Sequence, residues 1–95
     1  MALEFARPER VTSSRAVSKQ PCCISVLVVT GKGGGTGILT IRNGPTSDSE
    51  IIAKFQVAVA ESRPFNFSQG LYLNRGCYIE LNDYIEEALV LIKEI

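Results

Sequence analysis

Short apolar segments separated by turn-forming residues run through the sequence from Pro21 to its end. Residues 24–30 (ISVLVVT) are rich in β-branched side chains and predict a strand, and residues 38–42 (ILTIR), followed by the turn signal Asn-Gly-Pro, predict a second one. Between them, residues 31–37 (GKGGGTG) hold five glycines and predict a flexible loop. We therefore expect these two strands to pair as a hairpin with a glycine-rich tip.

The second half of the chain continues this pattern. Residues 65–67 (FNF) and 71–73 (LYL) flank a Ser-Gln-Gly turn, and residues 74–76 (NRG) lead into residues 77–81 (CYIEL). Strands at this spacing, separated by Gly and Asn turns, are typical of antiparallel sandwiches and barrels. The sequence therefore predicts an all-β fold, a small antiparallel β-sandwich or jelly-roll-like domain over residues 21–95 with an extended N-terminal arm.

Residues 47–60 fit both a helix and a strand. Ser47 and Glu50 have the spacing of a helix capping box, but apolar side chains also occupy every second position from Ile51 to Val59. We predict a strand here, because this alternation matches the two faces of a sheet.

Residues 83–95 have the same ambiguity. Asn82 or Asp83 is placed to cap a helix, whereas residues 88–92 (ALVLI) suit a buried strand. We again predict a strand; a helix here would make the domain α+β.

Residues 1–20 have the character of an arm and not of a core element. Pro8 and the Thr-Ser-Ser cluster at 12–14 interrupt any periodic pattern. The segment holds four positive and two negative charges, which leaves six and eight for residues 21–95, so the arm is net +2 and the body net −2. We expect the arm to dock on an acidic surface of another subunit, the alternative being a frayed terminus without a role. The candidate subunit or lattice contacts are Leu3, Phe5, Arg7, Arg10, Val11, Arg15, Lys19 and Lys32.

The composition argues against catalysis. The chain has 95 residues, enough for one small domain, and it has no histidine, which is the commonest general base and metal ligand. Ten basic and ten acidic residues give no net charge to attract nucleic acid or anionic lipid. We expect no enzymatic activity, no cofactor, no metal and no nucleic-acid or membrane partner.

The glycine-rich loop does not match a nucleotide-binding motif. In a P-loop, Lys and then Ser or Thr follow the last glycine, and a helix begins there. Here Lys32 stands at the front of the loop, Ile38 follows Gly37, and the next element is predicted as a strand. The dinucleotide pattern GxGxxG fails in every frame.

Other polar and aromatic groups also have structural explanations. The late carboxylates have no cleft to face across, so they indicate a solvated acidic edge or a docking patch for the arm. They are Glu80, Asp83, Glu86 and Glu87. The three tyrosines have only Arg63 and Arg75 between the aromatic positions, which favours packing over base stacking.

The three cysteines indicate a reducing compartment. Cys22 and Cys23 are adjacent and Cys77 is distant, which is not a disulfide framework or a zinc motif. Neighbouring residues of a strand point to opposite faces, so at most one of Cys22 and Cys23 can face the core beside Cys77. Because neither a signal peptide nor a long apolar run is apparent, we expect a soluble protein made in the cytoplasm.

Residues 37–95 resemble the small structural proteins of tailed bacteriophages. The resemblance rests on residues 37–44 (GILTIRNG), 65–67 (FNF), 70–73 (GLYL) and 76–81 (GCYIEL), followed by the apolar C-terminal run. The glycine-rich loop and residues 83–87 (DYIEE), where a shorter neutral turn is expected, depart from the family pattern.

The resemblance implies a virion subunit with an all-β, jelly-roll-like fold. We expect a capsid decoration or cement protein that binds the major capsid protein lattice, or another virion subunit, as a homo-oligomer, either dimer or trimer. No functional residues carry over from the family. The alternatives are a head–tail or tail component, and a small phage-encoded module that binds a host protein.

Overall fold

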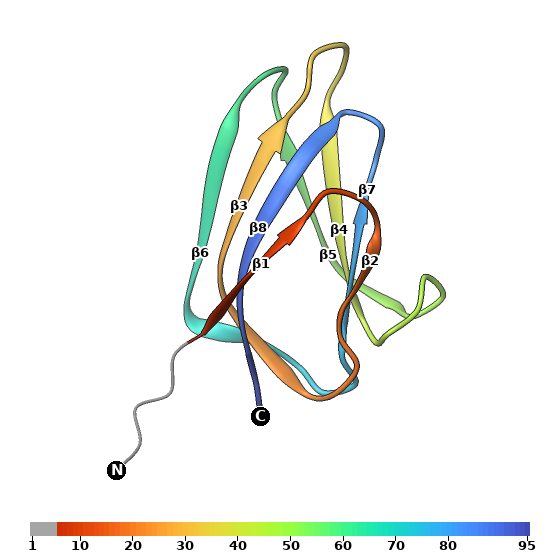
Figure 1. The fold of residues 1–95 in the computed structure, drawn as a ribbon, viewed down its shortest axis with the longest axis vertical. Coiled ribbons are helices and arrows are strands. Elements are labelled where there is room, and N and C mark those ends of the chain that lie inside the picture. Colours follow the sequence, from red (N-terminus) through yellow and green to blue (C-terminus); the bar gives the residue numbers. More distant parts are fainter. Residues whose placement is uncertain (1–5) are drawn as a thin grey trace.

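The computed structural model describes residues 6–95, which form eight strands (Figure 1). Two of the candidate contacts, Leu3 and Phe5, lie outside the described residues. The strands are β1 (Arg7–Val11), β2 (Arg15–Ser18), β3 (Cys22–Gly31), β4 (Gly37–Asn43), β5 (Glu50–Val57), β6 (Ser62–Leu73), β7 (Cys77–Leu81) and β8 (Ile85–Glu94). Residues 6–95 contain no helix, so the all-β prediction is confirmed.

The strands form two antiparallel sheets of four strands each. Sheet A has the order β1-β8-β3-β6 and sheet B the order β2-β7-β4-β5. Every consecutive pair of strands except β4 and β5 therefore changes from one sheet to the other. Figure 1 shows β6, β3, β8 and β1 side by side, with the strands of sheet B beyond them.

Most of the strand predictions are confirmed. Both ambiguous segments are strands, β5 and β8, and residues 24–30, 38–42 and 77–81 lie within β3, β4 and β7. The two short segments around the Ser-Gln-Gly turn are instead one long strand, β6, whose pairing with β3 has a register shift between Ile24 and Val26.

The predicted hairpin between the first two strands is wrong. β3 lies in sheet A between β8 and β6, whereas β4 lies in sheet B between β7 and β5. β3 is paired along both of its edges, by β8 and β6, so strands from distant parts of the chain satisfy its backbone hydrogen-bonding groups. The glycine-rich loop therefore crosses from one sheet to the other.

The prediction of an arm is wrong for the strand residues between 7 and 18. β1 pairs with β8 along one edge of sheet A, and β2 pairs with β7 along one edge of sheet B. Val11 and Val17 are buried in the core. The sequence did not predict these short edge strands because they carry charged residues. In the structure, Glu9 pairs with both Arg7 and Arg15 at the edge of the core.

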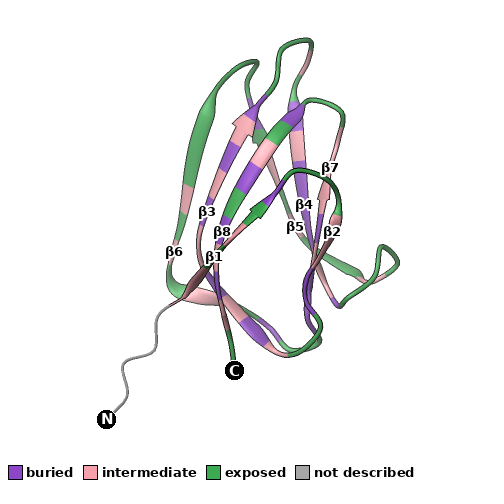
Figure 2. Ribbon diagram, viewed as in Figure 1, coloured by how far each residue is buried: buried purple, intermediate pink, exposed green. Residues whose placement is uncertain are grey.

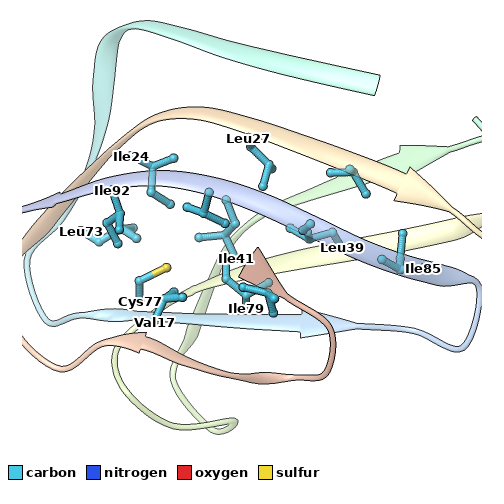
Figure 3. Close-up of a cluster of buried hydrophobic side chains, with 14 of the residues drawn as sticks. Val17, Ile24, Leu27, Leu39, Ile41, Leu73, Cys77, Ile79, Ile85 and Ile92 are labelled. Atoms are coloured by element: carbon cyan, nitrogen blue, oxygen red, sulfur yellow. The ribbon is translucent and has the colours of Figure 1, made fainter. Parts of the chain in front are cut away.

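The hydrophobic core lies between the two sheets (Figure 3). Its largest side chains include Ile24 and Leu27 of β3 and Leu39 and Ile41 of β4, all without exposed surface. Buried positions alternate with half-buried or exposed ones along β3 and β8 (Figure 2). The buried apolar residues are Val11, Val17, Cys22, Ile24, Leu27, Val29, Leu39, Ile41, Val57, Leu73, Cys77, Ile79, Ile85, Ala88, Val90 and Ile92.

An aromatic cluster closes the side of the core where β5 and β6 are the edge strands. The ring of Phe55 lies 4.7 Å from that of Phe65 and 5.9 Å from that of Phe67, measured between centroids. The guanidinium carbon of Arg63 lies 5.5 Å from the Phe65 centroid. These contacts join the two sheets at edges that share no backbone pairing.

Candidate functional site

Apolar side chains cover the solvent-facing side of sheet A. Antiparallel pairing sets Leu91 beside Val26 and Leu89 beside Val28. Their strand neighbours Leu27 and Val90 are buried, so these four side chains point away from the core. Leu89 is 39% exposed. We call this surface the outer apolar face; it consists of Pro8, Val26, Val28, Pro64, Tyr72, Leu89 and Leu91.

Such a face is unusual for an antiparallel sheet with water on one side. A half-solvated strand alternates apolar inward and polar outward positions, whereas a strand covered on both faces is apolar throughout. The central strands β3 and β8 of sheet A, with the runs VLVV and ALVLI, follow the second pattern. The outer apolar face therefore has the composition of a surface that is covered in the functional protein.

The outer side of sheet B is polar by comparison. Arg42 of β4 pairs with Glu80 of β7, with 2.9 Å between Nε and Oε1. In the next row of this sheet, Thr40 lies between Lys54 and Glu80. The two sheets thus present different outer surfaces. The central rows of sheet A are apolar, whereas in sheet B the exposed apolar side chains Ile51 and Ile52 lie in the edge strand β5.

A shallow pocket of about 260 Å³ opens on the outer apolar face. Its apolar floor includes Val28 and Leu89, and its rim carries an ion pair between Arg10 and Glu87. An apolar side chain fits such a depression, and a charged rim orients the partner that supplies it.

The contact residues predicted from the sequence lie in different parts of the structure. Arg7 and Arg15 are engaged with Glu9 between β1 and β2, and Arg7 also reaches Glu94. Val11 is fully buried in the core, so its prediction as a subunit contact is wrong. Arg10 alone lies beside the outer apolar face, at its rim.

The two predicted lysine contacts lie in loops. Lys19 lines a pocket of about 390 Å³ between β2 and the end of β8. Lys32 begins the glycine-rich loop, where its backbone N–H donates to the carbonyl of Tyr84 at 2.9 Å. A Cβ on Gly35 would come within 3.0 Å of the Tyr84 ring, so this loop packs against the β7–β8 turn.

Sequence reasoning missed the central residues of the outer apolar face. The signal was present in the uninterrupted apolar runs of β3 and β8, which indicated strands covered on both sides. These runs are equally consistent with strands buried inside one domain, because the sequence alone does not show that only one side of sheet A meets sheet B.

The cysteines lie on both sides of sheet A. Cys22 and Cys77 are buried and joined by a side-chain hydrogen bond, whereas Cys23 is half-buried on the opposite side. The prediction that at most one of the adjacent pair faces Cys77 is confirmed. The hydrogen bond to Cys22, together with burial, raises the pKa of the Cys77 thiol, which is therefore protonated at neutral pH.

Thiol modification should distinguish these positions. A thiol reagent should modify Cys23 in the native protein about 100-fold faster than Cys22 or Cys77, because reaction of the buried pair requires an opening of the core costing about 3 kcal/mol. Ellman's reagent would measure this, and Cys23→Ser should abolish the fast phase. A fast phase that persists in that variant would contradict the burial of Cys22 and Cys77.

Glu94, at the end of β8, is held in its ionised form. The hydroxyl of Ser18 donates to its Oε2 at 2.8 Å, and Arg7 lies 3.3 Å from its Oε1. The hydrogen bond from Ser18, and secondarily Arg7, lower the pKa of Glu94 from its ordinary value of 4.5. Because the folded-state pKa is depressed, the stabilisation is present above pH 4.5 and is lost as the pH falls through the lowered value.

Replacement of Ser18 tests this arrangement. Ser18→Ala should raise the pKa of Glu94 towards its ordinary value, because the largest cause of the shift is removed. Carboxyl ¹³C chemical shifts followed by NMR as a function of pH would measure it, with Ser25→Ala as a control distant from Glu94. An unchanged titration of Glu94 in Ser18→Ala would refute the role of the hydroxyl.

The described residues define an all-β protein with an interface-like surface on one sheet. Comparison of the chain with protein families, characterised proteins and solved structures finds no match. Within residues 6–95, His, Cys, Asp and Glu side chains form no group of three or more that could hold a metal ion. The same part of the chain has no helix long and apolar enough to cross a membrane.

Proposed function

We propose that the protein is a non-enzymatic structural subunit that assembles through its outer apolar face. The observation that carries this proposal is the outer apolar face itself, whose central residues Val26, Val28, Leu89 and Leu91 lie side by side on sheet A. The corresponding central row of sheet B holds Lys54, Thr40 and Glu80. Apolar surface of this kind gains free energy when a partner removes it from water. Binding to the folded state alone also stabilises a small domain.

The assembly that we propose is a virion, with the protein as a capsid decoration or cement subunit. The resemblance of residues 37–95 to small structural proteins of tailed bacteriophages supports this assignment. The strand orders β1-β8-β3-β6 and β2-β7-β4-β5 support it further, since we infer from them a jelly roll, a sandwich architecture frequent among viral capsid proteins.

Purified particles test this function directly. Quantitative mass spectrometry should find the chain in a fixed ratio to the major capsid protein, and recombinant protein should bind again to particles from which it has been stripped. Copies confined to tail fractions would favour a tail component. Absence of the chain from particles, with capture of a host protein instead, would overturn the virion assignment.

A further inference from the structure

We propose that a second copy of this chain covers the outer apolar face, packed sheet against sheet around a two-fold axis. This inference rests on the assembly part of the proposed function and identifies the partner at that surface. Closed two-fold dimers are the commonest soluble oligomers, and their interfaces require a surface that complements itself.

The size of the face is adequate for such a dimer. β3 and β8 each have ten residues, and four strands lie side by side in sheet A. At about 4.8 Å between strands and about 3.4 Å per residue, the whole outer side of sheet A, including the polar and charged residues at the ends of its strands, measures about 600 Å². Two copies then bury about 1,200 Å², which is the lower end of the range for specific interfaces.

The centre of the face can pack against itself. Leu89, Leu91, Val26 and Val28 form two adjacent rows of apolar side chains without a charge among them. Two sheets that pack face to face keep their strand directions within about 30° of each other, and interdigitating aliphatic side chains fill the space between them. The central residues of one copy would therefore meet those of the other.

Charge at the two ends of β8 selects the direction of the axis. Glu87 and its partner Arg10 lie at one end of the face, and Lys93 lies in the row at the other end, beside Cys23. A two-fold axis in the interface and perpendicular to the strands reverses their direction and brings Lys93 of each copy to Glu87 of the other. An axis parallel to the strands would bring the Lys93 ends of both copies together.

Sedimentation of the full chain tests the dimer. The wild-type protein should sediment at about twice 10.4 kDa at high concentration and dissociate on dilution. Leu89→Lys should weaken dimerisation by at least about 100-fold, because it buries an ammonium group at the centre of the interface. Ile38→Lys, a matched change on the outer side of sheet B, should leave it unchanged. Circular dichroism checks that both variants fold.

A charge exchange tests the axis. Glu87→Lys and Lys93→Glu should each weaken the dimer by about 5- to 10-fold, and the double variant should recover to within about threefold of wild type, because the pairs between copies are restored with reversed sign. Weakening in the double variant that equals the product of the two single effects would overturn the proposed direction of the axis.

The outcomes separate this inference from the proposed function. A concentration-independent monomer overturns the dimer; if that monomer is stoichiometric on particles, the virion function stands and the outer apolar face meets the capsid protein. If the protein is a dimer in solution but is absent from particles, the dimer stands and the virion function is overturned. A dimer that resists Leu89→Lys, in a variant that circular dichroism shows to be folded, also overturns the inference, because its interface lies elsewhere.

Discussion

Deletion of residues 1–20 is expected to abolish folding of the protein. The deletion removes β1 and β2, which are edge strands of the two sheets, and with them the buried side chains of Val11 and Val17. Burial of a valine side chain contributes about 1.5–3 kcal/mol. The deletion also leaves one edge of β8 and one edge of β7 without a partner strand. The total is comparable with the stability of a small domain, about 5–15 kcal/mol.

The measurement is far-ultraviolet circular dichroism with urea denaturation. The truncated chain should lack a cooperative transition, whereas deletion of residues 1–5, which removes none of the described strands, serves as the control. An arm, as the sequence predicts, would be dispensable for the fold. A fragment of residues 21–95 that unfolds cooperatively near the wild-type midpoint would therefore contradict the placement of β1 and β2.

Gly76→Ala is expected to destabilise the protein by about 3 kcal/mol. Gly76 precedes β7 with a φ of +122°, a backbone conformation that side chains with a Cβ rarely adopt. A Cβ at this position would also lie 2.7 Å from the carbonyl oxygen of Ser18, a backbone atom of β2. Alanine therefore has to strain its own backbone and displace β2 from β7.

Gly33→Ala is the matched control, because a Cβ there would meet no atom within 4 Å. Its stability should change by less than about 0.5 kcal/mol, with a small gain where the added methyl restricts the unfolded chain. Urea midpoints at a fixed pH compare the two variants. Equal midpoints for Gly76→Ala and Gly33→Ala would show that β2 does not approach Gly76 closely.

The locations of most strands were predictable from local sequence. β-branched runs and turn residues identified β3, β4 and β7, and alternation correctly favoured a strand over a helix at β5. There, Phe55 and Val57 turn inward while Lys54 and Gln56 are exposed. These features depend on each residue and its near neighbours, which the sequence displays directly.

The pairing of the strands was not predictable in the same way. The short distance in sequence between β3 and β4 favoured a hairpin, yet β3 pairs with β8 and β6, which lie far along the chain. β1 and β2 escaped prediction because each is short, carries charged residues and buries little until the partner strand is present. Only the folded chain brings Arg15 of β2 to Glu9 and Glu94 of β8 to Arg7, and these pairs compensate for the charges of β1.

The candidate contacts named from the sequence do not form one surface in the structure. The excess of basic residues near the N-terminus predicted contacts with another subunit. In the structure, Arg7 and Arg15 instead form ion pairs within the chain. The outer apolar face is assembled from four strands, so its residues become neighbours only through the register of sheet A.

By itself, the sequence determined that this protein is built of strands, because side-chain shape and alternation act locally. It also determined that β3 and β8 carry apolar residues on both faces. The tertiary structure decided which of those faces became the core, because sheet B covers only one side of sheet A. The side left in water, with Leu89 and Val28 at its centre, is therefore a property of the fold that no single segment contains.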